Sequence, residues 1–87
     1  MNKAKAAKLI ATLRANPADV KFGTLDQICQ YYFGPPRNKG TSHHVYKTPW
    51  QGDPRVNIQK SGGGKAKAYQ VRQVLKAIER MNTDDQP

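Results

Sequence analysis

The sequence predicts an α+β domain of two layers, in which helices cover one face of a three-stranded antiparallel sheet. Two observations indicate this class. Apolar residues recur with helical spacing towards both ends of the chain, and the middle alternates apolar and polar residues between turn-forming Gly, Pro and Asp residues. The expected order is helix, helix, strand, strand, strand, helix. Such an arrangement leaves the second face of the sheet open to solvent.

The size of the chain limits where chemistry can occur. A chain of 87 residues corresponds to one domain, and we expect residues 1–82 to form it, with residues 83–87 as a polar tail. A domain this small buries only about 60–65% of its unfolded surface, so an open face or groove is a better place for a site than a deep cavity. We expect a cytoplasmic protein, because the chain has neither a secretion signal nor an apolar run that could span a membrane.

The first helix is expected over residues 4–15. Its apolar positions follow the i, i+3, i+4, i+7 pattern of a helix packed on one side: Ala6, Leu9, Ile10 and Leu13. The basic residues Lys3, Lys5, Lys8 and Arg14 lie mostly on the other sides of this helix. The Asn16-Pro17 pair disfavours continuation of the helix.

A second, short helix is expected within residues 23–34. Thr24 is placed to cap its start, with Gln27 at the capping-box spacing, and Gly34 followed by two prolines is typical of a stop. The apolar stripe of this helix consists of Leu25, Ile28, Cys29 and Tyr32. We therefore interpret Cys29 as a small buried hydrophobic residue. As the single cysteine of the chain, it also excludes an internal disulfide and a thiolate-rich zinc site.

Three strands are expected at residues 36–40, 42–48 and 54–60, with turn-forming residues between the second and the third. In the third strand Val56 and Ile58 alternate with polar residues, which indicates one buried face. In the second strand, alternation sends the adjacent His43 and His44 to opposite faces. The periodicity leaves open which of the two histidines points inward.

The last helix follows a glycine-rich loop and is the most regular of the chain. Its core stripe is Val71, Val74, Leu75, Ile78 and Met81, and its basic face is Lys65, Arg72, Lys76 and Arg80. Glycines ahead of a helix can bring backbone N–H groups close to a phosphate, although a flexible turn with solvated lysines fits the pattern equally well. The loop lacks the sequence of a nucleotide-binding P-loop.

Charge is the strongest global signal. Fifteen Lys and Arg against six Asp and Glu give a formal net charge of +9 and a pI of about 10.0. We favour a nucleic-acid partner, because neutralising phosphates releases counterions. A basic surface without a ligand and attraction to an anionic membrane are the alternatives. No expected helix has the bulky apolar face that membrane attachment requires.

The two histidines allow several interpretations. On opposite faces they cannot readily hold one metal ion, and Asp53 is the only acidic residue near them in sequence, so we expect neither a metal nor another cofactor. RNA can be cleaved without metal if a histidine takes the proton of the 2′-hydroxyl and cations stabilise the charged transition state. Two ordinary histidines in a strand are the structural alternative.

The run "KGTSHHVYKTP", followed by "RVNIQ" and "AYQVRQVLKAIERM", resembles the HicA toxins of type II toxin–antitoxin systems. The resemblance covers residues 36–81, and its motif, strands and closing helix occur in the family's order. It implies a fold like that of double-stranded RNA-binding domains, ribosome-independent cleavage of mRNA, and neutralisation by a HicB antitoxin in a hetero-oligomer. Residues 4–15 are an addition to the family pattern, and Thr41 interrupts its Gly-Ser-His motif.

The resemblance implies that His43, which directly follows the motif serine, is the catalytic residue. Ser42, His44 and Lys47 are candidates for a supporting role. The candidate RNA-binding residues are all cationic: Arg37, Lys39, Arg55, Lys65, Lys67 and Arg72. Two other functions remain open, namely a non-catalytic module that binds double-stranded RNA and a domain whose basic face meets an acidic protein.

Overall fold

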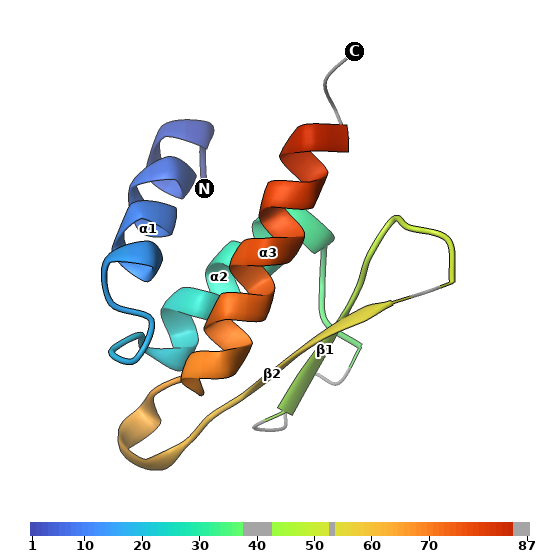
Figure 1. The fold of residues 1–87 in the computed structure, drawn as a ribbon. Helices are drawn as coiled ribbons and strands as arrows, with labels where there is room; N and C mark the ends of the chain where they lie inside the picture. The colour runs from blue at the N-terminus through green and yellow to red at the C-terminus, as the bar shows by residue number, and fades with distance from the viewer. Residues whose placement is uncertain (38–42, 53, 85–87) are drawn as a thin grey trace.

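The computed structural model describes residues 1–37, 43–52 and 54–84. These residues form an α+β fold, as predicted, in which helices lie on one side of a two-stranded antiparallel sheet (Figure 1). The elements in chain order are α1 (Lys3–Ala15), α2 (Phe22–Phe33), β1 (His43–Lys47), β2 (Arg55–Gln59), the 3₁₀ turn η1 (Gly62–Gly64) and α3 (Ala68–Asp84).

The third strand predicted at residues 36–40 is not confirmed. Residues 38–40 lie outside the described part of the chain, and the described residue Arg37 is in a bend. The backbone N–H of Arg37 donates to the carbonyl oxygen of Val45 at 2.9 Å. The chain therefore approaches β1 on the edge opposite β2, through this backbone hydrogen bond between described residues.

Helix α1 begins one residue before its predicted start because Asn2 caps it. The Asn2 side chain accepts a hydrogen bond from the backbone N–H of Lys5 at 2.8 Å, which satisfies a donor of the first turn. Ala6, Ile10 and Leu13 are buried, as their spacing predicted.

The prediction that Thr24 caps α2 is wrong. The helix begins at Phe22, two residues before Thr24, and the Thr24 N–H donates to the carbonyl oxygen of Lys21 at 3.1 Å within the first turn. Phe22 is only 7% exposed and lies one turn before the buried Leu25, so its burial extends the helix towards the N-terminus. The predicted stop is confirmed: the helix ends at Phe33 and Gly34 is its C-cap residue.

Gly34 has φ 89° and ψ −169°, a backbone conformation that is essentially restricted to glycine. We expect Gly34→Ala to lower the free energy of unfolding by about 1–3 kcal/mol. Gly23, in the first turn of α2, is the matched control, because an added Cβ meets no atom within 4 Å at either position. Gly23→Ala is expected to raise the free energy of unfolding by about 0.5–1 kcal/mol. Urea denaturation of both variants measures the difference, and equal effects would contradict this account of Gly34.

Strand pairing orients the sheet over the helices. Tyr46 pairs with Val56 and His44 pairs with Ile58, so these four side chains share one face of the sheet. Helix α2 packs against both strands, and α3 packs against β2. Tyr46 and Ile58 are fully buried there, which confirms the predicted inward face of β2 and shows which face of β1 is inward.

One hydrophobic core contains residues from α1, α2, β1, β2 and α3. Cys29 is buried among apolar residues of α2, as its place on the stripe predicted, and burial raises the pKa of its thiol. In α3 the predicted stripe is buried at Val71, Val74 and Ile78.

The turn between β1 and β2 contacts α3 outside this core. The Arg80 guanidinium lies 4.2 Å from the ring centroid of Trp50, so a cation–π contact holds the turn on α3.

Candidate functional site

The two histidines occupy different environments, as strand alternation predicted. His44 lies on the inner face of the sheet, where its side chain is 12% exposed, and His43 lies on the outer face and is exposed. The histidines therefore cannot act together on one group from the same face. Each has to be considered with its own neighbours.

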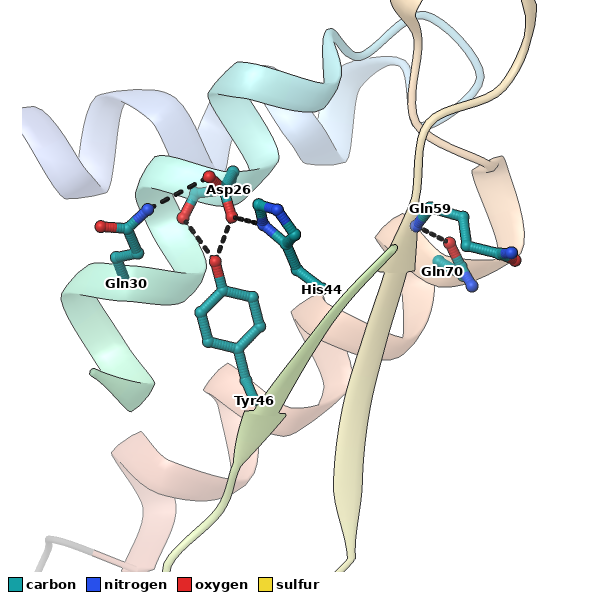
Figure 2. Close-up of polar contacts among 6 residues, drawn as sticks. All are labelled: Asp26, Gln30, His44, Tyr46, Gln59 and Gln70. Carbon is teal, nitrogen blue, oxygen red and sulfur yellow. Dashed lines mark hydrogen bonds and ion pairs between the residues drawn. The ribbon is translucent and has the colours of Figure 1, made fainter. Parts of the chain in front are cut away.

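His44 belongs to a polar cluster between β1 and α2, which comprises Asp26, Gln30, His44 and Tyr46 (Figure 2). The Asp26 carboxylate accepts a hydrogen bond from the Tyr46 hydroxyl and lies 2.8 Å from Nδ1 of His44. Gln30 Nε2 donates to the other carboxylate oxygen at 3.1 Å. Since the carboxylate is the acceptor, Nδ1 of His44 carries the hydrogen in this contact.

Burial fixes the cluster in place. Tyr46 is fully buried, and burial together with the hydrogen bond to Asp26 raises the pKa of its phenol, so the hydroxyl remains a donor at neutral pH. The His44 ring meets the Phe22 ring edge-on, with centroids 5.2 Å apart. His44 therefore joins β1 to α2, and its side chain is held on three sides by Asp26, Phe22 and the sheet.

The outer face of the sheet is polar and carries His43. Its described residues are His43, Val45, Lys47, Arg55, Asn57 and Gln59. His43 is directly opposite Gln59, and the exposed Asn57 is its diagonal neighbour across the strands. An imidazole on an open strand surface, next to amide side chains that can donate hydrogen bonds, can reach a phosphodiester of a bound polynucleotide.

Two cations face each other at the opposite end of this surface. Lys47 is paired with Arg55 in the register, and both side chains are exposed. Two cationic side chains directly opposite one another on a sheet can both contact one phosphate. Lys47 lies four residues from His43, or about 13 Å along the strand. Lys47 and Arg55 therefore cannot contact the phosphate next to His43. They can only contact a phosphate farther along the same bound polynucleotide.

Lys65, predicted to bind RNA, is already engaged. Its Nζ lies 2.5 Å from Oδ1 of Asp19, and this hydrogen bond and charge lower the pKa of the Asp19 carboxyl. The pair connects η1 to the α1–α2 connection, next to a β-bridge between Lys21 and Lys65. The charge of Lys65 is thus partly balanced within the protein.

The remaining predicted residues are spread around the sheet. Arg37 is exposed beside the edge of β1 that faces away from β2. Arg72 is exposed on the first turns of α3. Lys67 is half-buried, and its carbonyl oxygen accepts from Gln70 and Val71 at the start of α3. Ser42 and Lys39 lie outside the described residues.

Asp26 and Gln30 were not singled out from the sequence. Asp26 precedes His44 by 18 residues, and no short motif links them. The position of Asp26 in the sequence could have identified it. Asp26 flanks the apolar stripe of α2, directly after Leu25, and a carboxylate that is half-buried there needs hydrogen-bond donors. His44 and Tyr46, two residues apart on one strand face, are suitable donors.

Among residues 1–37, 43–52 and 54–84, no three His, Cys, Asp or Glu side chains form a group that could hold a metal ion. In the same residues no helix has the length and apolar character needed to cross a membrane. The comparisons with protein families, curated proteins and solved structures gave no match to this chain.

Proposed function

We propose that this protein is an endoribonuclease toxin that resembles the HicA family and cleaves mRNA without a metal ion. The observation that carries the proposal is the place of His43, exposed on the open polar face of the sheet, opposite Gln59. The net charge of +9 supports a polyanionic substrate. The His-His motif and the order of strand, strand and helix support the toxin assignment.

In the proposed reaction His43 acts as the general base. Its imidazole takes the proton of a 2′-hydroxyl, and the 2′-oxygen then forms a bond to the adjacent phosphorus. The P–O5′ bond breaks, and the departing oxygen takes a proton from solvent at this open surface. The products are a 2′,3′-cyclic phosphate and a 5′-hydroxyl. Asn57 and Gln59, next to His43, are placed to donate hydrogen bonds to the phosphate oxygens as charge develops.

The proposal includes a complete three-stranded fold like that of double-stranded RNA-binding domains, with residues 36–40 as the additional strand. The backbone hydrogen bond from Arg37 to Val45 supports a strand at that edge. The proposal also includes a cytoplasmic location, inhibition of translation and growth, and a HicB-like antitoxin that neutralises the toxin in a hetero-oligomer. Coexpression with the product of an adjacent reading frame, followed by copurification, tests the partner.

The cationic pair is expected to contribute affinity rather than chemistry. We predict that the double variant Lys47→Gln/Arg55→Gln binds single-stranded RNA more weakly than the parent. The plot of the logarithm of the association constant against the logarithm of the salt concentration should become less steep by about 1.4, the value for two phosphate contacts. The paired variant Lys5→Gln/Lys8→Gln, on the exposed surface of α1, controls for net charge. The measurement is a salt titration of fluorescence anisotropy, and an equal decrease in both double variants would show that the effect is one of overall charge alone.

Cleavage itself distinguishes this proposal from a non-catalytic RNA-binding module. The exposed cations Arg72 and Lys76 on α3 support such a module as the second candidate. The purified protein is incubated with RNA in excess EDTA, and the cleaved fraction is measured over time. Cleavage is expected for the toxin, whereas salt-sensitive binding with no cleavage would support the binding module. A requirement for added divalent ions would contradict the proposed mechanism.

A further inference from the structure

Tyr69, in the first turn of α3, is an exposed aromatic residue at the same end of the sheet as His43. Tyr69 is 52% exposed. The other large apolar residues that are exposed in the described part of the chain are Met1 and Tyr31. A single exposed tyrosine needs no special explanation in itself. The surroundings of Tyr69, however, distinguish it from the other two.

The hydroxyl of Tyr69 is connected to the sheet through Gln70. Gln70 Nε2 donates to the Tyr69 hydroxyl at 3.3 Å, and Gln70 Oε1 accepts from the backbone N–H of Gln59 at 2.6 Å. Figure 2 shows the contact between Gln59 and Gln70. Gln70 is 3% exposed and is the buried polar side chain of the described core. The Tyr69 ring is thus joined at its polar end to β2, while much of its surface meets solvent.

The point of attachment places the Tyr69 hydroxyl beside the edge of β2 that faces away from β1, because the N–H of Gln59 donates to Gln70 there. Gln59 is the register partner of His43, and paired residues have Cα atoms about 5 Å apart. The Tyr69 hydroxyl therefore lies within about 15 Å of the backbone of His43, at the end of the sheet where β1 begins and β2 ends. The His43 side chain points to the outer face, whereas α3 packs on the inner side of the sheet. Farther along α3, Arg72 and Lys76 follow Tyr69 at spacings of three and seven residues and are exposed on the same side of the helix.

We propose that Tyr69 stacks on an unpaired nucleobase of the bound RNA where the strand passes the edge of β2, with Arg72 and Lys76 holding the phosphates beyond it. This inference rests on the proposed function and specifies its substrate as RNA that is single-stranded where it contacts α3. An aromatic ring accepts any base face, provided that the base has left its own stack. A duplex keeps its bases stacked and offers this ring no partner.

The test measures binding separately from cleavage, in a His43→Ala background. Stacking contributes about 1–3 kcal/mol per base, so Tyr69→Leu is expected to weaken binding of a single-stranded RNA about 5- to 150-fold. Binding of a blunt RNA duplex is expected to change less than twofold. Tyr69→Phe keeps the ring and is expected to bind single strands within twofold of the parent. Tyr31→Leu, at the exposed tyrosine of α2, is the matched control and is expected to have no effect.

Each outcome decides the inference. It is overturned if Tyr69→Leu binds single strands like the parent, if Tyr31→Leu weakens binding equally, if Tyr69→Phe loses as much as Tyr69→Leu, or if the parent binds no RNA. Circular dichroism confirms that each variant is folded at the assay temperature. If the protein with His43 restored binds RNA but never cuts it, the proposed function fails while the binding result for Tyr69 stands. If that protein cuts RNA and Tyr69→Leu binds normally, only the present inference fails.

Discussion

Replacing His43 by alanine is expected to reduce RNA cleavage about 10²- to 10⁴-fold, the usual contribution of a general acid or base. The reason is that His43 is the imidazole exposed on the polar face of the sheet, whereas His44 is turned towards α2. His43 is exposed and is not part of the core, so the variant should unfold at nearly the same temperature as the parent. Cleavage rates of a fluorescent RNA, corrected for the folded fraction, measure the effect.

His44→Asn is the matched control for this prediction. Its side-chain amide can still donate to Asp26, so folded His44→Asn protein should retain most of the cleavage activity. A folded His43→Ala protein that cuts RNA at the parental rate would contradict the assignment. Loss of cleavage in folded His44→Asn alone would transfer the chemistry to the Asp26–His44 pair.

Replacing Asp26 by alanine is expected to have the largest effect on stability, a loss of about 2–4 kcal/mol in the free energy of unfolding. The substitution leaves the hydroxyl of the fully buried Tyr46 without its acceptor and removes the partner of His44 Nδ1. Asp19→Ala is the matched control, because Asp19 is an exposed carboxylate whose ion pair with Lys65 lies in solvent. Chemical denaturation monitored by circular dichroism gives both values, and a loss below 1 kcal/mol for Asp26→Ala would contradict the role of the cluster.

A double-mutant cycle separates the hydrogen bond from the loss of packing. Tyr46→Phe removes the donor, and Asp26→Leu removes the acceptor. Removing both partners of a buried hydrogen bond costs less than leaving one of them unsatisfied. The combined variant should therefore be more stable than the sum of the single losses predicts, by about 0.5–3 kcal/mol. Strict additivity would show that Asp26 and Tyr46 do not interact.

The sequence predicted the parts of the fold that depend on local periodicity. The stripes of α1, α2 and α3, the stop at Gly34 and the inward residues Val56 and Ile58 agree with the structure. Each is determined by neighbours within one or two turns of the chain, or by alternation along a strand. The start of α2 was misplaced because Thr24 has the residue type of a cap, and the burial of Phe22 against the rest of the core outweighs that local preference.

The candidate site depended on contacts that periodicity does not encode. Alternation predicted that His43 and His44 separate, but the inward choice follows from Asp26, which lies on another element and offers an acceptor to both His44 and Tyr46. The strand register likewise places Arg55 opposite Lys47, four residues along β1 from His43. The candidate phosphate contacts therefore divide into those beside His43 and those at the far end of the sheet.

The most direct test of the central claim is cleavage of an RNA oligonucleotide in EDTA, compared with oligonucleotides that carry a single 2′-deoxy residue at each position in turn. The account predicts that the wild-type protein cuts the all-RNA strand and leaves a 2′,3′-cyclic phosphate. It also predicts that a 2′-deoxy residue on the 5′ side of a cut site abolishes that cut alone. Cleavage at a 2′-deoxy position, or cleavage only after a divalent metal ion is added, would contradict a mechanism in which His43 activates the 2′-hydroxyl.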